Sequence, residues 1–199
     1  MQAWEEMIIE RKEANIKIRV VTEADAKELL NIYAPYVMHT AITFEYEVPS
    51  VHEFKKRINV VQKRYPYLAA LIDDTIVGYA YVSPLKERKA YDWAVETSIY
   101  VDQKKRGMGI GKALYEALER ALEAQGILNL YACIATPKEE DEHLTLDSVR
   151  FHEHMGYRMI GEFKECGYKF HQWYNMVWME KQIGEHIAEP PEVKRFEKI

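Results

Sequence analysis

Three glycines in five positions, Gly107, Gly109 and Gly111, mark the part of this sequence best suited to bind a ligand through its backbone. Residues 94–101 before them are rich in β-branched and aromatic side chains, and residues 112–125 after them repeat Leu at helical spacing. This order predicts a strand, a tight turn and a helix. Glycine permits positive φ and close approach of a ligand, and the first N–H groups of a helix lack intrahelical partners. The turn is therefore predicted to hold a phosphate group.

The spacing of the glycines excludes two common phosphate sites. A P-loop ends in Gly-Lys-Ser/Thr, which is absent here, and glycines at 107, 109 and 111 do not fit the dinucleotide fingerprint G-x-G-x-x-G. A simple NTPase or a dinucleotide-dependent dehydrogenase is therefore not expected. From the turn alone, a flexible loop in front of an ordinary helix stays an open alternative, because short motifs occur by chance.

The composition indicates one globular domain. The 199 residues are 48% hydrophobic and 30% charged, and the net charge of −5 gives no overall attraction to nucleic acid or anionic lipid. No apolar run approaches the ~20 residues that span a bilayer. The N-terminus, with Glu5, Glu6, Glu10 and Arg11, is unlike a signal peptide. We therefore expect a cytoplasmic protein that binds neither nucleic acid nor membrane.

The cysteines give no sign of a metal site. Cys133 and Cys166 are the only two, and neither belongs to a CxxC pair or a metal-ligand cluster. We expect both to be reduced and structural, since a free cysteine often behaves as a small buried hydrophobe. No metal is therefore predicted.

Hydrophobic periodicity predicts strands and helices along the whole chain. Strands are expected at residues 16–21, 67–72, 76–82, 94–101, 127–135, 157–164 and 174–179, and helices after Thr22, after Ser50, over 112–125 and over 148–155. These elements make a mixed α/β (α+β) sheet of about seven strands with about four helices. Residues 1–15 are helix-compatible, but both chain ends are expected to be frayed.

Several motifs resemble those of one enzyme family. Residues Arg106 to Gly111 resemble the Q/R-x-x-G-x-G/A acetyl-CoA motif of the GNAT acyltransferases. Residues 88–96, 147–157 and 166–173 resemble the same stretches in the phosphinothricin N-acetyltransferases of that family. The resemblance implies a GNAT domain over residues 16–182 with extensions at 1–15 and 183–199. It also implies a mostly antiparallel sheet whose fourth and fifth strands splay apart to admit acetyl-CoA, and a homodimer.

The resemblance implies three catalytic candidates for acetyl transfer to an amine. Glu96, on the strand before the glycine turn, would take the ammonium proton as general base. His152 stands where many GNAT enzymes carry a tyrosine that protonates the leaving thiol, and imidazole can serve as acid or base. Tyr157 is a substitute proton donor. The structural alternatives are that Glu96 pairs with a cation and that His152 is packed or solvated.

The cofactor contacts implied by the resemblance are largely backbone contacts. A strand N–H would polarise the thioester carbonyl, and Ile99, Tyr100 and Val101 would bind the pantetheine arm as an added strand. The pyrophosphate and its surroundings would be held by Arg106, Gly107, Met108, Gly109, Ile110, Gly111, Lys112 and Ser148. Lys104 and Lys105 either meet the 3′-phosphate or form a solvated loop.

The acceptor side is implied to lie before and along the Glu96 strand. Lys86 and Arg88 would bind an amino-acid carboxylate, since Arg can clamp one bidentately. Phe44, Tyr91, Trp93 and Thr97 would shape the pocket. The alternative is that residues 86–89 form an ordinary charged turn.

One loop departs from the family pattern. Where related enzymes carry a short loop with an asparagine, residues 137–147 form a longer loop with five acidic residues. These could favour a cationic acceptor or could simply be solvated. The leading hypothesis is an acetyl-CoA-dependent N-acetyltransferase for a small amino acid or analogue, such as phosphinothricin or methionine sulfoximine. The alternatives are a polyamine or other small-amine acetyltransferase, and a non-catalytic acyl-CoA-binding module.

Overall fold

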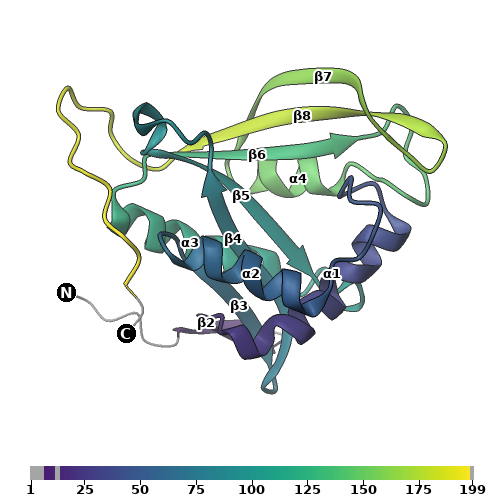
Figure 1. The fold of residues 1–199 in the computed structure, drawn as a ribbon, viewed down its shortest axis with the longest axis horizontal. Coiled ribbons are helices and arrows are strands. Elements are labelled where there is room, and N and C mark those ends of the chain that lie inside the picture. The colour runs from purple at the N-terminus through teal and green to yellow at the C-terminus, as the bar shows by residue number, and fades with distance from the viewer. Residues whose placement is uncertain (1–6, 12–13, 198–199) are drawn as a thin grey trace.

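The protein, described by a computed structural model over residues 7–11 and 14–197, folds around one eight-stranded sheet (Figure 1). The strand order is β1-β2-β3-β4-β5-β6-β8-β7. The strands are β1 (Met7–Arg11), β2 (Ala14–Val20), β3 (Tyr67–Ile72), β4 (Thr75–Pro84), β5 (Ala94–Val101), β6 (Asn129–Thr136), β7 (Arg158–Lys169) and β8 (Gln172–Gln182). The α-helices are α1 (Ala26–His39), α2 (Val51–Gln62), α3 (Ile110–Gln125) and α4 (Asp147–His154). Short 3-10 turns cover Glu23–Asp25, Lys89–Tyr91 and Gln103–Lys105.

The junction between β5 and β6 breaks the regularity of the sheet. These two strands pair in parallel, whereas the other neighbouring strands pair antiparallel. The parallel ladder holds only three pairs, from Ala94 with Asn129 to Glu96 with Tyr131. Beyond Glu96 the strands separate, and β5 continues along β4 alone. The predicted mixed sheet with a splayed pair is thus confirmed.

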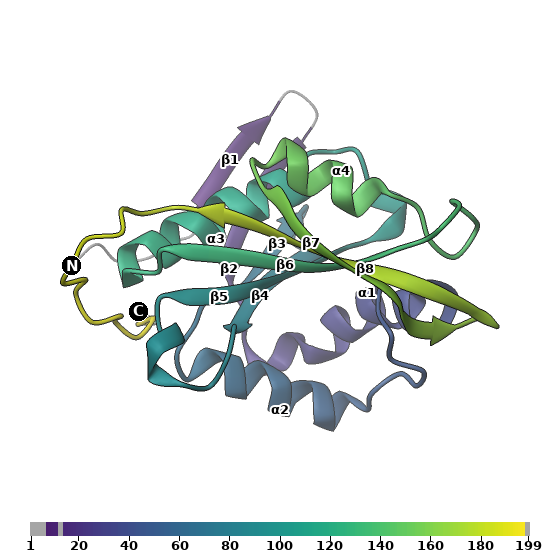
Figure 2. The ribbon, with the colours of Figure 1, turned by 90° about the horizontal axis from the view of Figure 1, so that it is seen from above.

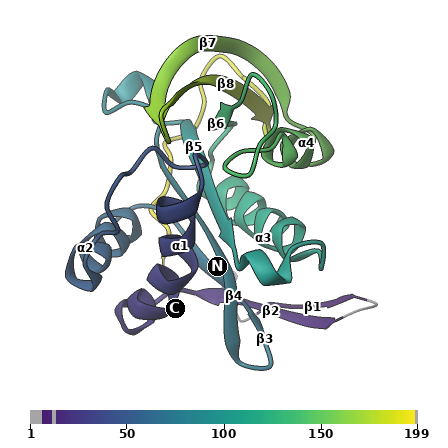
Figure 3. The same cartoon turned by 90° about the vertical axis from the view of Figure 1, so that its right-hand side faces the viewer.

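Helices cover both faces of the sheet. Figures 2 and 3 show α1 and α2 on one side, with α3 and α4 on the other. Strand alternation divides the core accordingly: on β3, Tyr67, Ala69 and Leu71 pack in the α1–α2 cluster, while Leu68 and Ala70 pack in the α3 cluster. Each face of the sheet therefore has its own core.

Local sequence signals account for several element boundaries. The Oγ of Ser50 accepts the N–H of Glu53 at 3.1 Å and caps α2, as predicted. Asp73 and Asp74 adopt φ of 48° and 59° in the hairpin turn between β3 and β4. Gly126, with φ of 91°, ends α3 in the left-handed conformation that favours glycine. These short-range interactions explain why the boundaries could be read from sequence.

The N-terminal segment differs from expectation. The helix-compatible interpretation is wrong for residues 7–11, because their backbone pairs with β2 from Met7–Ile18 to Arg11–Ala14 as β1. This strand raises the number in the sheet from about seven to eight.

The C-terminal segment is bound to the domain rather than frayed. In Figure 1 it returns from β8 along the left side of the molecule. The N–H of Lys194 donates to Gln125 O at 2.8 Å, and the N–H of Phe196 donates to Arg64 O at 3.0 Å. The side chain of Phe196 is buried. The segment therefore joins the end of α3 to the link between α2 and β3.

Candidate active site

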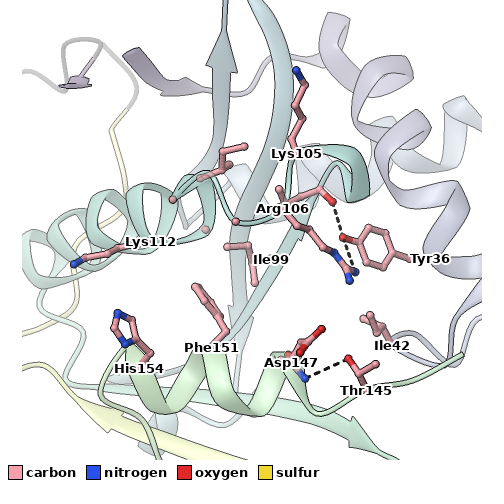
Figure 4. Close-up of a pocket in the computed structure, with 16 residues that line it drawn as sticks. Tyr36, Ile42, Ile99, Lys105, Arg106, Lys112, Thr145, Asp147, Phe151 and His154 are labelled. Carbon is pink, nitrogen blue, oxygen red and sulfur yellow. Dashed lines mark hydrogen bonds between the residues drawn. The ribbon is translucent and has the colours of Figure 1, made fainter. Parts of the chain in front are cut away.

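Two cavities meet where β5 leaves β6. The larger, of about 640 Å³, lies between the start of α3 and helix α4 (Figure 4). The smaller, of about 250 Å³, lies around Glu96 and the open ends of the two strands. Ile42, Ile99 and Ser148 line both cavities, so the two spaces share walls.

The glycine turn forms one wall of the larger cavity. Gly107 and Gly109 have φ of 80° and 77°, a region costly for other residues, and Gly109 is the N-cap of α3. The first N–H groups of α3, from Ile110 onward, lack intrahelical partners. Together with the helix dipole they form an anion-binding site.

The charge of the larger cavity is mostly positive. Lys105, Arg106 and Lys112 line it, against the single carboxylate of Asp147 among the lining residues. Lys112 is also 3.7 Å from Glu116 on the next turn of α3. This distribution suits a ligand that carries several negative charges.

Tyr36 links α1 to this cavity. Its hydroxyl donates to Val101 O at 2.5 Å, and the Arg106 guanidinium lies 3.5 Å from the hydroxyl and 5.7 Å from the ring centre (Figure 4). Tyr36 therefore holds the end of β5 and orients Arg106. No sequence motif marks Tyr36 as a site residue, because at helical spacing it reads as a core residue.

Gly111 allows α3 and α4 to approach each other. A Cβ at this position would lie 3.0 Å from Cε2 of Phe151, which also lines the cavity. Of the predicted cofactor residues, Met108 packs against the core instead of lining a cavity, and Tyr100 lines the smaller one. The others line the larger cavity: Ile99, Val101, Arg106, Gly107, Gly109, Ile110, Gly111, Lys112 and Ser148. Lys105 lines it too, whereas Lys104 lines neither cavity.

Glu96 is the only carboxylate among the residues that line the smaller cavity. It stands at the last β5–β6 pair, and burial raises the pKa of its carboxyl, while the positive charge of Lys86 partly offsets the rise. Phe44, Cys133 and Met176 contribute an apolar wall. Burial raises the pKa of the Cys133 thiol to about 12, which leaves it a poor nucleophile.

His152 is part of a buried hydrogen-bond chain. It is 3% exposed, with Nδ1 2.7 Å from Ser148 O and Nε2 3.0 Å from the Tyr115 hydroxyl. Burial lowers the pKa of its imidazole to about 4, so the ring is neutral near pH 7. The Tyr115 hydroxyl lies 3.2 Å from Thr97 Oγ1. Tyr115 lines the smaller cavity. Its sequence position does not reveal this, because it lies within the apolar repeat of α3 and reads as a core residue.

Tyr157 lies behind this chain. Its hydroxyl is 3.5 Å from Thr97 Oγ1, its side chain is buried, and it lines neither cavity. Burial raises the pKa of Tyr157 well above its usual range. Thr97 and Phe44, both predicted acceptor residues, line the smaller cavity with Glu96 and His152.

Four predicted acceptor residues lie outside both cavities. Lys86, Arg88 and Tyr91 are exposed on the segment between β4 and β5. Trp93 points to the C-terminal segment, where its Nε1–H donates to Pro191 O at 2.8 Å. Of these four, only Lys86 acts electrostatically on Glu96.

The acidic loop is packed against the domain instead of facing the smaller cavity. Asp141 Oδ1 accepts the N–H groups of His143 and Leu144, each at 2.8 Å, and the Leu144 side chain is buried. Thr145 and Asp147 are the loop residues that line a cavity, and it is the larger one. The loop therefore places no carboxylate among the residues around Glu96.

The described part of the chain holds neither a membrane-spanning helix nor a metal-binding cluster. Across residues 7–11 and 14–197, no helix is long and apolar enough to cross a membrane. Within the same part of the chain, no cluster of three or more His, Cys, Asp or Glu side chains is arranged to hold a metal ion.

Comparison with known proteins agrees with this geometry. The acetyltransferase (GNAT) domain model matches residues 18–178. The chain is 32% identical to the phosphinothricin N-acetyltransferase of Streptomyces viridochromogenes, over 88% of this chain and 91% of that protein. It is 25% identical to the L-methionine sulfoximine/L-methionine sulfone acetyltransferase of Salmonella typhimurium, over 86% and 96%.

A solved structure gives the same result. The phosphinothricin acetyltransferase from Sinorhizobium meliloti, crystallised in complex with AcCoA, superposes with a TM-score of 0.81 at 32% identity, covering 89% of this chain and 94% of that one. The family match spans the glycine turn, the residues that line both cavities and the sheet from within β2 to within β8. This chain therefore belongs to the GNAT family of N-acetyltransferases, enzymes that use acetyl-CoA as cosubstrate.

Proposed function

We propose that this enzyme transfers an acetyl group from acetyl-CoA to the amine of a small amino acid or analogue of the phosphinothricin or methionine sulfoximine type, by direct attack on the thioester. The carrying observation is that the two cavities share a wall on β5, at Ile99. Along β5, Glu96, Thr97 and Ser98 line only the smaller cavity and Val101 lines only the larger one, while Ile99 between them lines both. Donor and acceptor bound in these two cavities can thus meet beside Ile99.

Glu96 is proposed as the general base. The acceptor amine enters as an ammonium ion and must lose a proton before it can attack the carbonyl carbon. A carboxylate with a raised pKa is a better proton acceptor than an ordinary one, because its basicity lies closer to the working pH. The position of Glu96 at the strand separation places it beside the shared wall of the cavities.

Backbone groups of β5 are proposed to stabilise the transition state. Beyond Glu96, residues 97–101 have no ladder partner on the β6 side, so this edge can bind the pantetheine arm and direct an N–H at the carbonyl oxygen. The departing thiolate then takes a proton. His152 is neutral and both its nitrogens are occupied, so we assign it to holding the Tyr115 hydroxyl. Tyr115, which lines the smaller cavity, supplies the proton and regains one from water as the products leave, whereas Tyr157 lines neither cavity and stays behind it.

The smaller cavity favours a compact amino acid over a polyamine. A polyamine needs several negative groups along its length, but Glu96 is the only carboxylate among the residues that line this space. Lys86 contributes positive charge near Glu96, which suits an acceptor that carries its own carboxylate. A volume of about 250 Å³ also suits a small molecule.

The homodimer and the cytoplasmic location remain predictions. For the dimer we propose the exposed face of the β7–β8 hairpin, since β7 is an edge strand of the sheet. Exposed apolar side chains on it are Met159, Ile160, Phe163, Tyr168 and Trp173. Phe163→Glu should reduce the mass in sedimentation equilibrium to that of one chain, whereas Val60→Glu, which changes an exposed residue on α2, should not.

An amine panel tests the function. With acetyl-CoA in excess, thioester loss would be followed with phosphinothricin, methionine sulfoximine, methionine sulfone and spermidine, by thioester absorbance because the exposed Cys166 consumes thiol reagents. Turnover with the amino-acid analogues but not with spermidine is the expected result. Turnover with spermidine alone would favour the polyamine alternative, and binding of acetyl-CoA without turnover of any amine would favour a non-catalytic module.

A further inference from the structure

Lys169, at the end of β7, is a buried cation with an unusual set of partners. Lys169 is only 3% exposed, and its Nζ donates to the carbonyl oxygens of Val37, Thr40 and Thr43, each at 2.8 Å. An ammonium group has three donors, so these carbonyls use all of them. Burying such a charge is costly without full hydrogen bonding. The ammonium is therefore committed to this one segment of chain.

The segment that Lys169 holds leads directly into the smaller cavity. Val37 lies in the last turn of α1, Thr40 is its C-cap, and Thr43 belongs to the loop that follows. Three successive loop residues, Ile42, Thr43 and Phe44, line the cavity. The three hydrogen bonds from Nζ therefore fix the backbone from which one wall of the cavity projects.

Gly167 acts on the same loop from the same strand. A Cβ at this position would lie 2.2 Å from Cε2 of Phe44, so only glycine leaves room for the ring. Positions 167 and 169 lie on one face of β7 because side chains alternate along a strand. Gly167 thus leaves space for the Phe44 ring, and Lys169 binds the backbone that precedes Phe44.

The acidic loop supports this segment from outside. Ala41 N–H donates to His143 O at 3.1 Å, and the His143 ring stacks on Phe170 with centroids 3.9 Å apart and planes 8° apart. Leu144 packs with Ala41 in a small separate core. The loop that departs from the family pattern thus packs against the segment that Lys169 holds.

We propose that Lys169 is a positioning residue for acceptor binding, which fixes residues 40–44 as the wall of the acceptor pocket. This inference rests on the proposed function, because it takes the smaller cavity as the acceptor site. The donor site should be nearly independent of Lys169. Among the residues that Lys169 anchors, only Ile42 also lines the larger cavity. Lys169 therefore controls acceptor affinity more than donor affinity.

Lys169→Met tests the proposal with Lys164→Met as its matched control, since Lys164 is an exposed lysine on the same strand. For Lys169→Met we expect the acceptor KM to rise about tenfold or more, with kcat and the Kd for acetyl-CoA changed less than about threefold. Lys164→Met should change none of them. Gly167→Ala should raise the acceptor KM as well, and this variant provides the test if Lys169→Met does not fold. An unchanged acceptor KM in folded variants would overturn the proposal.

Hydrogen exchange gives a readout that does not require turnover. The N–H groups of Ile42 and Glu45 are bonded to Thr40 Oγ1 and Thr43 Oγ1 at 3.2 and 3.3 Å. These two amides should exchange faster in Lys169→Met than in Lys164→Met, and equal protection would overturn the positioning role. If the unmodified enzyme acetylated no amine while this difference persisted, the proposed function would fail and the anchoring of the loop would stand.

Discussion

The hydroxyl of Thr97 donates to the carbonyl oxygen of Tyr131 at 3.1 Å, one residue beyond the last β5–β6 backbone pair. The bond lies where β5 and β6 begin to separate, and it fixes the Thr97 side chain against β6. Thr97 also connects Tyr131 to the chain of Tyr115 and His152.

Replacing Thr97 by Val should destabilise the fold. The variant keeps the shape of the side chain but removes the hydroxyl that bonds Tyr131 O and the buried Tyr115 hydroxyl, which should lower the free energy of unfolding by about 1–3 kcal/mol. Thr97→Ser keeps the hydroxyl and should lose only about 0.8 kcal/mol with its methyl group. Urea denaturation measures both. A Val variant as stable as the unmodified protein would show that this hydrogen bond has no net effect.

Glu96→Gln should abolish most of the acetyl transfer. Without a proton acceptor, kcat should fall about 10²–10⁴-fold, while the Kd for acetyl-CoA should stay within about twofold because Glu96 does not line the larger cavity. Initial rates and titration calorimetry give the two values. Glu87→Gln, which removes an exposed carboxylate near Lys86, is the control. Unchanged turnover in Glu96→Gln would refute the general-base assignment.

Lys86→Met should move the acidic limb of the pH–rate profile to higher pH. The charge of Lys86 opposes the rise in the pKa of Glu96, so removing it should raise that pKa further, and the base should be protonated at a higher pH. At mildly acidic pH, kcat/KM relative to its alkaline plateau should fall several-fold. Lys86→Arg keeps the charge and should leave the limb in place. If the limb does not move in Lys86→Met, the charge of Lys86 does not affect the pKa of Glu96.

Gly107→Ala and Gly126→Ala form a matched pair. Both glycines have positive φ, of 80° and 91°, and in both cases an added Cβ meets open space. Each change should cost about 1–2 kcal/mol of stability, from backbone strain. Only Gly107→Ala should weaken acetyl-CoA binding, about tenfold, since Gly126 lies at the other end of α3. Equal Kd values in the two variants would contradict the phosphate role of the turn.

His152 should make the protein sensitive to acid. Its pKa is about 4 in the folded state and 6.5 as an ordinary side chain, so the unfolded chain binds the extra proton first. Stability is therefore lost as pH falls from about 6.5 toward about 4, by an amount of the order of 3 kcal/mol. In His152→Gln this part of the pH dependence should be missing. Denaturation curves across the window test it, and parallel profiles for both proteins would contradict the burial of a neutral imidazole.

Features set by neighbours in the chain could be predicted from the sequence. Ser50 reaches an N–H three residues away, and the turn from Gly107 to Gly111 sits between a strand and a helix whose periodicities are clear. The splayed strands and the Glu96 position came from resemblance to a known family. The confirmed fold thus depended on both local pattern and family motif.

Features set by distant contacts could not be predicted. Trp93 lies in a strip expected to shape the acceptor pocket, but its N–H binds Pro191, which is 98 residues further along the chain. The acidic loop reads as solvated, but Leu144 finds a small core made with Ala41 and Tyr174. No periodicity in either segment encodes these partners.

The position of β8 bears on how the enzyme forms during synthesis. This strand follows β6 and β7 in the chain but lies between them in the sheet. Until residue 182 has left the ribosome, β6 lacks the long antiparallel partner that occupies its outer edge, and only three parallel pairs tie it to β5. Nascent chains generally fold domain by domain. The wall of the smaller cavity that Lys169 holds is therefore among the last parts of the molecule to become complete.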